Sequence, residues 1–351
     1  MKHAMIAGFF LLSITCPVSA QVTDFEGLSL LDELETLNAR FSKIQFLHHV
    51  HPKGQWMVSH KYMVMNMSGN RNGTDQIATD AVLDQYMVAP TDMTMQMHML
   101  HFMYGVTDDF TLMAMIPYWI LSMDHQTRMG MPFTAEASGL ADIKLTAQQA
   151  LFNLNEKHRF VAKGTVSLPT GSIDQKGITP MSQGQQVSLP YPMQLGSGSF
   201  DVAPTLSYFG YGGNWAWSAH TTGVFRLNEN ENNYRLGNQF TVSAEALYTR
   251  SDWLIPGIRV DGYTWGDVRG RNPKLMPMPN GMFMVPTADP NLRSGERIDM
   301  TFNLTLHIPR GFLEGVAFAL EFSKPVYQHL EGPQLETDYA FSTYLEWSWY
   351  F

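Results

Sequence analysis

Methionine and histidine are the residue types in this chain that could bind a metal ion, and both are concentrated in its first third. The chain has 24 methionines and 12 histidines in 351 residues. Thioether sulfur is a soft ligand that suits Cu(I), and imidazole suits copper and zinc. In three consecutive segments methionines recur at alternate positions, and one histidine shares their pattern: Met57, Met63, Met65, Met67, Met93, Met95, Met97, Met99, His101, Met103, Met113 and Met115.

Alternate residues of a β-strand lie on one face of it. Adjacent strands are about 4.8 Å apart and same-face residues about 6.8 Å, so these side chains would form one patch on a sheet. In 55–67 the methionines share their face with Lys61, whereas Trp56 and Val58 lie on the other face, so we expect the methionines to point inward. Such a wall could bind copper or another soft metal ion. The alternative is that methionine only provides flexible apolar packing.

A second candidate metal site precedes the first of these segments. His48, His49 and His51 fall within four residues and could bind Cu(II) or Zn(II). The alternative is that they are surface histidines near a membrane interface. Copper is the one metal ion that both clusters suit, and no other cofactor is indicated.

Composition limits the classes of partner. The net charge is -9 without a basic cluster, which argues against nucleic acid and anionic lipid as partners. Charged residues make up only 16% of the chain and aromatic residues 12%, whereas a well-solvated globular surface needs more charged and fewer aromatic residues. We therefore expect lipid to cover part of the surface. Cys16 is the single cysteine and lies in the first twenty residues, so disulfides are not expected in the mature chain.

The first twenty residues predict a secretory signal peptide. A charged start is followed by an apolar run over 4–14 and by small residues before Gln21. Residues 21–54 then form a short N-terminal periplasmic segment. Whether it is a helix or a plug in a barrel stays open, although apolar residues recur at helical spacing: Leu30, Leu34, Leu37, Phe41 and Ile44.

Residues 55–351 divide into segments with period-two alternation, which is typical of transmembrane β-strands. The connections alternate between short and long, as in a barrel with periplasmic turns, outer loops and both termini in the periplasm. The sequence therefore predicts an all-β fold, an antiparallel up-and-down transmembrane β-barrel of about twelve strands in the outer membrane. The expected strands are 55–67, 93–105, 111–121, 141–152, 158–168, 200–210, 214–227, 237–249, 253–265, 297–308, 315–325 and 338–351.

Several short segments are similar to those of one known family. They are Gly139-Leu-Ala-Asp-Ile-Lys-Leu-Thr-Ala147, Ser167-Leu-Pro-Thr-Gly-Ser172, Leu195-Gly-Ser-Gly-Ser-Phe-Asp-Val202, Tyr104-Gly-Val-Thr-Asp108 and Ile116-Pro-Tyr118. They resemble the outer-membrane family of the meta-pathway of phenol degradation, a group of porin-like transporters. The resemblance implies a barrel that passes small, often apolar or aromatic, compounds. The methionine and histidine enrichment departs from the family and indicates a specialised branch.

Three functions remain as hypotheses. The first is a channel or transporter for small solutes that handles copper or another soft metal ion along a Met/His wall. The second is passive uptake of small apolar or aromatic compounds, and the third is a non-conducting structural or metal-binding barrel. The partners are outer-membrane lipid and a small solute or metal ion, and the oligomeric state stays open.

An enzyme is not expected. His220 has no serine two residues after it that could act as a nucleophile. The carboxylates of the expected strands are spread along the sequence without a cluster: Asp124, Asp142, Glu245, Asp299 and Glu321.

Overall fold

The computed structural model describes residues 50–154, 157–251, 253–275, 277–279, 281–308 and 315–350. The predicted signal peptide, most of the segment 21–54, His48 and His49 lie outside the described residues. Within the described part, no helix is long and apolar enough to cross a membrane.

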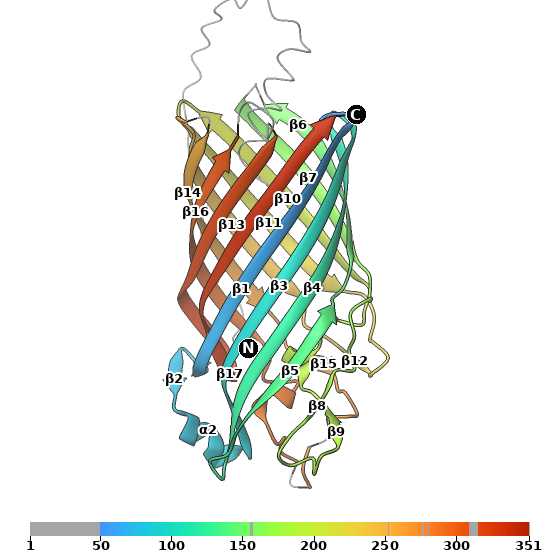
Figure 1. The fold of residues 1–351 in the computed structure, drawn as a ribbon, viewed down its shortest axis with the longest axis vertical. Helices are drawn as coiled ribbons and strands as arrows, with labels where there is room; N and C mark the ends of the chain where they lie inside the picture. The colour runs from blue at the N-terminus through green and yellow to red at the C-terminus, as the bar shows by residue number, and fades with distance from the viewer. Residues whose placement is uncertain are drawn as a thin grey trace, which may run out of the picture.

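The described residues form a tall, closed antiparallel barrel (Figure 1). Each strand pairs with the next one around the wall, and the last strand pairs with the first. A closed barrel pairs the backbone groups of every strand, which is what a strand in a lipid environment requires. The strands of the wall are β1 (Gln55–Gly73), β3 (Val88–Thr107), β4 (Phe110–Thr127), β6 (Lys144–Leu154), β7 (His158–Ser167), β10 (Asp201–Gly212), β11 (Trp215–Arg226), β13 (Gln239–Tyr248), β14 (Leu254–Trp265), β16 (Gly295–His307) and β17 (Val316–Tyr350).

The last strand crosses the wall twice. Residues 317–330 of β17 pair with β16, and residues 334–350 pair with β1. The sheet has thirteen strands in the described part of the chain, and two of them, β2 (Asp75–Ile77) and β5 (Pro132–Leu140), lie off the closed ring. The eleven that remain cross the wall twelve times because β17 crosses twice. The predicted fold class and number of strands are confirmed.

The two faces of the wall differ in the way the sequence predicts. On β3, Leu100 and Phe102 are 42% and 40% exposed on the outside, whereas His101 between them is 2% exposed. The same alternation continues on the other strands, where large apolar side chains such as Val242 and Phe302 face outward. An apolar outer surface of this kind suits the hydrocarbon of a membrane.

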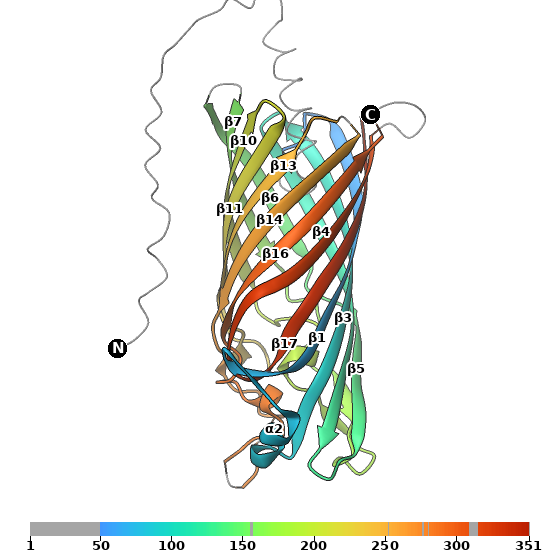
Figure 2. The same ribbon diagram turned by 90° about the vertical axis from the view of Figure 1, so that its left-hand side faces the viewer.

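The two ends of the barrel are also different (Figure 2). Short turns join the strands at the end where the C-terminus lies, as between β3 and β4 or β10 and β11. Long loops lie at the other end and carry the remaining short elements. These are β2, α2 (Thr79–Gln85), β8 (Lys176–Ile178), β9 (Gln186–Ser188), η2 (Tyr191–Met193), β12 (Tyr234–Arg235), β15 (Arg269–Gly270) and η3 (Pro286–Ala288). By the usual orientation of such barrels, the short turns are periplasmic and the long loops are outside the cell.

The long loops pack against one another through their own apolar core. Tyr191 from the loop 168–200, Tyr234 from the loop 227–238 and Phe283 from the loop 266–294 are buried together. The hydroxyl of Tyr191 accepts a hydrogen bond from the backbone N–H of Asn272 at 3.1 Å. These loops therefore form a structured cap at the outer end of the barrel.

Candidate functional site: the barrel lumen

The inward side chains of β1, β3 and β4 form a surface that we call the methionine wall. Residues on the three strands are directly opposite one another, so each level of the wall has three side chains. From the periplasmic end outward the rows are Met57, Met103 and Met113; Ser59, His101 and Met115; Lys61, Met99 and Pro117; Met63, Met97 and Trp119; Met65, Met95 and Leu121; and Met67, Met93 and Met123.

Burial shows that these side chains face the interior. Met57, Met103 and Met93 are 0%, 1% and 3% exposed, whereas outward Leu112 on β4 is 46% exposed. The structure thus places every methionine of the predicted patch, together with His101, on the inner face. Metal binding by these residues stays a prediction.

The outer end of the methionine wall is covered by the loop 168–200. Leu189, Met193 and Leu195 of this loop are buried in one cluster with Met93 and Met123. Met193 is completely buried. The apolar surface of the wall therefore continues directly into the cap.

One carboxylate holds that loop in place. Asp142 accepts hydrogen bonds from the backbone N–H of Gly171 at 2.9 Å and from both the backbone N–H and the hydroxyl of Ser197 at 2.8 Å each. A Cβ atom at Gly196 would lie 2.4 Å from the carbonyl oxygen of Gly171, so only glycine fits this approach. We call this arrangement the Asp142 joint.

The Asp142 joint unites three of the segments that carry the family resemblance. Asp142 belongs to 139–147, Gly171 to 167–172 and Ser197 to 195–202. The joint extends to Asp201, which accepts hydrogen bonds from the hydroxyl of Ser197 at 3.2 Å and from that of Ser199 at 2.7 Å. The sequence showed the segments separately, and the structure shows that they form one unit which fixes the outer loop to the wall.

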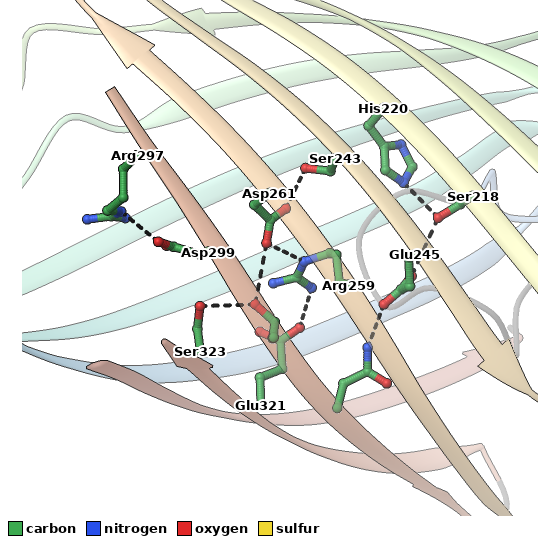
Figure 3. Close-up of polar contacts among 12 residues, drawn as sticks. Ser218, His220, Ser243, Glu245, Arg259, Asp261, Arg297, Asp299, Glu321 and Ser323 are labelled. Atoms are coloured by element: carbon green, nitrogen blue, oxygen red, sulfur yellow. Dashed lines mark hydrogen bonds and ion pairs between the residues drawn. The ribbon is translucent and has the colours of Figure 1, made fainter. Parts of the chain in front are cut away.

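A polar wall is formed by inward side chains of β11, β13, β14, β16 and β17 (Figure 3). Arg259 donates to Asp261 at 2.8 Å and to Glu321 at 2.6 Å. Glu321 also accepts a hydrogen bond from the hydroxyl of Tyr344 at 3.0 Å and lies 3.7 Å from the ammonium group of Lys61. Lys61 belongs to the methionine wall, so the two walls meet at this ion pair.

A second part of the polar wall surrounds His220. Its ring nitrogens lie 2.9 Å from the hydroxyl of Ser207 and 3.2 Å from that of Ser218. Figure 3 shows the contact with Ser218. Glu245 accepts a hydrogen bond from the side chain of Asn303 at 2.6 Å and lies 3.5 Å from the hydroxyl of Ser218. Sequence reasoning missed Ser207 because it lies on the neighbouring strand, directly opposite His220.

Sequence reasoning also missed the polar wall as a unit. Glu245, Asp299 and Glu321 each face the lumen from a different strand, and Arg259 and Arg297 pair with them or their neighbours. The available signal was that charged residues share the inward parity of adjacent strands. Of the carboxylates named from the sequence, Asp124 is not part of the polar wall, because it is exposed and accepts a hydrogen bond from Thr134.

Residues 50–54 close part of the periplasmic end. The backbone N–H of His51 donates to the hydroxyl of Thr111 at 2.8 Å, and a ring nitrogen of His51 lies 2.8 Å from Gln55. Burial lowers the pKa of His51 to about 4, against the opposing effect of the hydrogen bond with Gln55. Gly105 and Thr111 share the inward parity of Met103 and Met113, so this short segment lies on the inner face of the wall.

The closed antiparallel barrel, with its apolar outer face and short periplasmic turns, defines the class as an outer-membrane β-barrel protein. The sequence model of the family described as "Putative MetA-pathway of phenol degradation" matches residues 69–273. The chain therefore belongs to this family, and the resemblance in the short motifs is confirmed. No curated protein sequence matches the chain.

One solved structure shows the same fold. The chain is similar to the COG4313 outer membrane channel from Pseudomonas putida F1, with 12% identity, a TM-score of 0.60, and coverage of 87% of this chain and 99% of that one. It is less similar to the beta domain of the Bordetella autotransporter BrkA, with 8% identity, a TM-score of 0.45, and coverage of 85% and 100%. The translocator domain of the autotransporter NalP from Neisseria meningitidis has 6% identity, a TM-score of 0.45, and coverage of 85% and 90%. At 12% identity the likeness to the Pseudomonas channel supports the fold and nothing beyond it.

Proposed function

We propose that the protein is a passive outer-membrane channel for the uptake of small apolar compounds, including aromatic ones. The observation that carries the proposal is the methionine wall, an inner surface with a methionine in every row that runs from the outer loops to the periplasmic end. Membership of a family whose description names phenol degradation supports an aromatic substrate.

Thioethers suit the passage of such compounds. A methionine sulfur interacts with an aromatic ring by about 0.3–1.5 kcal/mol, and the side chain adapts its shape easily. Each row offers a contact of similar strength, so a molecule could exchange from row to row without being trapped. Trp119 lies in the same row as Met63 and Met97 and adds an aromatic surface midway.

The polar wall complements this surface. The two cations Arg259 and Lys61 are balanced by the two carboxylates Asp261 and Glu321, which leaves hydrogen-bonding groups in the lumen without a large field of one sign. A phenol-like molecule has an apolar ring and one hydroxyl group. A lumen with one apolar and one polar wall suits a molecule of that kind.

Transport of copper is the less supported of the two transport hypotheses. Nothing in the family description concerns a metal ion, whereas phenol is a small aromatic compound. Methionine packing inside a channel for apolar compounds explains the wall without a metal cargo.

Uptake by proteoliposomes tests the proposal. Vesicles that contain the protein should take up phenol and toluene faster than empty vesicles and faster than vesicles with a Met63→Gln/Met97→Gln variant. Glutamine has nearly the same length as methionine but puts an amide in the middle of the wall. The matched control is Met63→Leu/Met97→Leu, which keeps the wall apolar. Equal uptake by the glutamine and leucine variants would contradict the proposal.

A further inference from the structure

Two arginines from separate outer loops lie directly opposite each other. Arg235 on β12 is paired with Arg269 on β15 in a two-stranded antiparallel sheet at the outer end of the barrel (Figure 1). Like charges directly opposite on neighbouring strands destabilise a sheet. The sequence has no basic segment here, because the pair forms only when the two loops fold together. A bound anion would remove the repulsion between the two side chains.

The two arginines point away from the core of the cap. Tyr234 precedes Arg235 on β12 and is 1% exposed within that core. Successive side chains of a strand point to opposite faces, so Arg235 and its partner Arg269 point outward. Arg269 is exposed, and its side chain has no hydrogen bond or ion pair with the residues that the structure describes.

Backbone contacts hold this small sheet in place. The backbone N–H of Asn230 donates to the carbonyl oxygen of Tyr234 at 2.8 Å, and that of Arg271 donates to the carbonyl oxygen of Asn233 at 3.1 Å. A Cβ atom at Gly270 would lie 2.4 Å from the same oxygen of Asn233, so only glycine permits this close approach. The backbone positions of both arginines are therefore set before a ligand binds, which reduces the entropy lost on binding.

An open pocket of about 470 Å³ lies beside the pair. Arg269, Phe240 and Asn238 are among the residues that line it. Asn238 accepts a hydrogen bond from the backbone N–H of Arg226 at 3.2 Å, and the carbonyl oxygen of Arg226 accepts one from the guanidinium group of Arg235 at 3.4 Å. Arg235 therefore adjoins the pocket that Arg269 lines.

The pocket lies where the lipid-facing surface meets the outer loops. Phe240 is 48% exposed on the outer face of β13, and Leu227, next to Arg226 in the chain, is 58% exposed. Such apolar side chains suit the acyl chains of a lipid, and the aromatic residues of a barrel mark the membrane interface. The arginines lie on the loops beyond this apolar surface, where lipid head groups meet water.

Acidic groups near the pocket do not cancel the charge of the arginines. Asp267 lines the pocket, and its Oδ1 atom accepts hydrogen bonds from the backbone N–H groups of Arg293 at 2.9 Å and Ser294 at 2.7 Å. The guanidinium group of Arg293 also interacts electrostatically with this carboxylate. Glu229 and Glu231 belong to the loop 227–238, and within the described residues neither forms an ion pair with either arginine.

We propose that Arg235 and Arg269 bind a phosphate group of lipopolysaccharide, the phosphorylated glycolipid of the outer leaflet of the outer membrane. A guanidinium group matches phosphate well, because it donates parallel N–H bonds in a fixed fork. The acyl chains of the glycolipid then lie against Phe240 and Leu227. The net charge of -9 argues against anionic lipid for the chain as a whole, and this pair is a local exception that folding produces.

The site is independent of the proposed uptake function. It lies on the outside of the barrel, whereas uptake depends on the inner face of the wall. A loss of uptake would leave the site untouched, and absence of lipid binding would leave the uptake proposal untouched. The test is therefore a binding measurement that does not involve transport.

The full chain, refolded in detergent so that it carries no bacterial lipid, is titrated with lipid A, the bisphosphorylated anchor of lipopolysaccharide. Native mass spectrometry counts the bound molecules, and we expect one that binds tightly. Arg235→Gln/Arg269→Gln should weaken its binding by about tenfold or more, which corresponds to about 1.4 kcal/mol. Lipid A from which a phosphatase has removed the phosphates should bind the unchanged protein equally weakly.

The matched control is Lys157→Gln/Arg250→Gln, which removes two exposed cations from periplasmic turns and changes the net charge by the same amount. It should bind lipid A as the unchanged protein does, and heat-modifiable gel migration verifies that both variants fold. Inorganic phosphate lacks acyl chains and should not displace lipid A at equal concentration. The proposal is overturned if inorganic phosphate does so, if lipid A does not bind, if its phosphates make no difference, or if both double variants bind it equally.

Discussion

Asp142 and Ser197 are 55 residues apart in the sequence and are joined by two hydrogen bonds of 2.8 Å. Both oxygens of the Asp142 carboxylate accept from backbone N–H groups, of Gly171 and of Ser197. These contacts fix the loop 168–200, which covers the outer end of the methionine wall. One buried carboxylate therefore fixes this loop, in addition to the apolar clusters that hold the cap.

Asp142→Asn should loosen this loop. An amide group would place an N–H donor against one of the two backbone donors, and an unsatisfied buried donor costs about 1–3 kcal/mol. We expect faster proteolytic cleavage within 168–200 and an unchanged barrel by gel migration. Asp124→Asn is the control, because Asp124 is exposed and its oxygen accepts from one side chain, that of Thr134. Equal cleavage of both variants would disprove the role of Asp142.

The polar wall should set the ion selectivity of the lumen. Glu321→Gln removes the negative charge between Lys61 and Arg259, so the lumen becomes more positive and should favour anions. The reversal potential of single channels in a KCl gradient measures this shift. Lys61→Met should shift it toward cations, and the double variant should lie near the unchanged protein. Glu296→Gln on the outer face should have no effect, and a shift there equal to that of Glu321→Gln would contradict the prediction.

Gly105→Ala should displace residues 50–54 from the periplasmic end. A Cβ atom at Gly105 would lie 2.0 Å from the carbonyl oxygen of Pro52 and 2.7 Å from that of His51. Both atoms belong to the backbone, so the segment itself must move. We expect a larger single-channel conductance in planar bilayers. Gly164→Ala is the control, since nothing lies within 4 Å of its added Cβ, and a conductance unchanged in both variants would show that the segment does not restrict the lumen.

Acid should weaken the contact between two outer loops. Asp174 accepts hydrogen bonds from Lys274 at 2.5 Å and from Asn232 at 2.9 Å, and these bonds hold the pKa of Asp174 below its usual value of 3.8. A carboxylate whose pKa is lowered by folding stabilises the folded loops at pH values above its usual pKa. This stabilisation is lost as the pH falls through the lowered pKa. Hydrogen exchange of 168–200 and 266–294, corrected for the intrinsic rate, should rise below pH 3.8. In Asp174→Asn this additional rise should be absent.

The fold was predictable because the hydrophobic alternation is strong in the part of each strand that faces lipid. The strands themselves are longer than predicted, since β1 extends to Gly73 and β4 to Thr127 instead of ending at 67 and 121. Residues 68–73 are polar or glycine on both faces, so no alternation marks them as a strand. Hydrogen bonds to the neighbouring strand extend β1 beyond the apolar region, and such pairing leaves no local signal.

The methionine wall was visible in the sequence because β1, β3 and β4 follow one another along the chain and are also neighbours in the barrel. The polar wall was not visible to the same degree. Its contact between Lys61 and Glu321 crosses the closure of the barrel, where the first strand meets the last. A pattern within one segment contains no information about such a partner.

By itself, the sequence determined which side chains face lipid and which face the lumen, because the two-residue repeat of a strand is a local property of the backbone. It also determined the order of short turns and long loops, except that the long connection predicted over 326–337 is wrong, because β17 continues through these residues as one strand. Tertiary structure alone decided that Asp142 accepts hydrogen bonds from Ser197 and that Glu346 is paired with Ser59 on the neighbouring strand. These contacts depend on how loops fold over the wall and on the register at which the barrel closes, and both are set by the packing and hydrogen bonds of the whole ring.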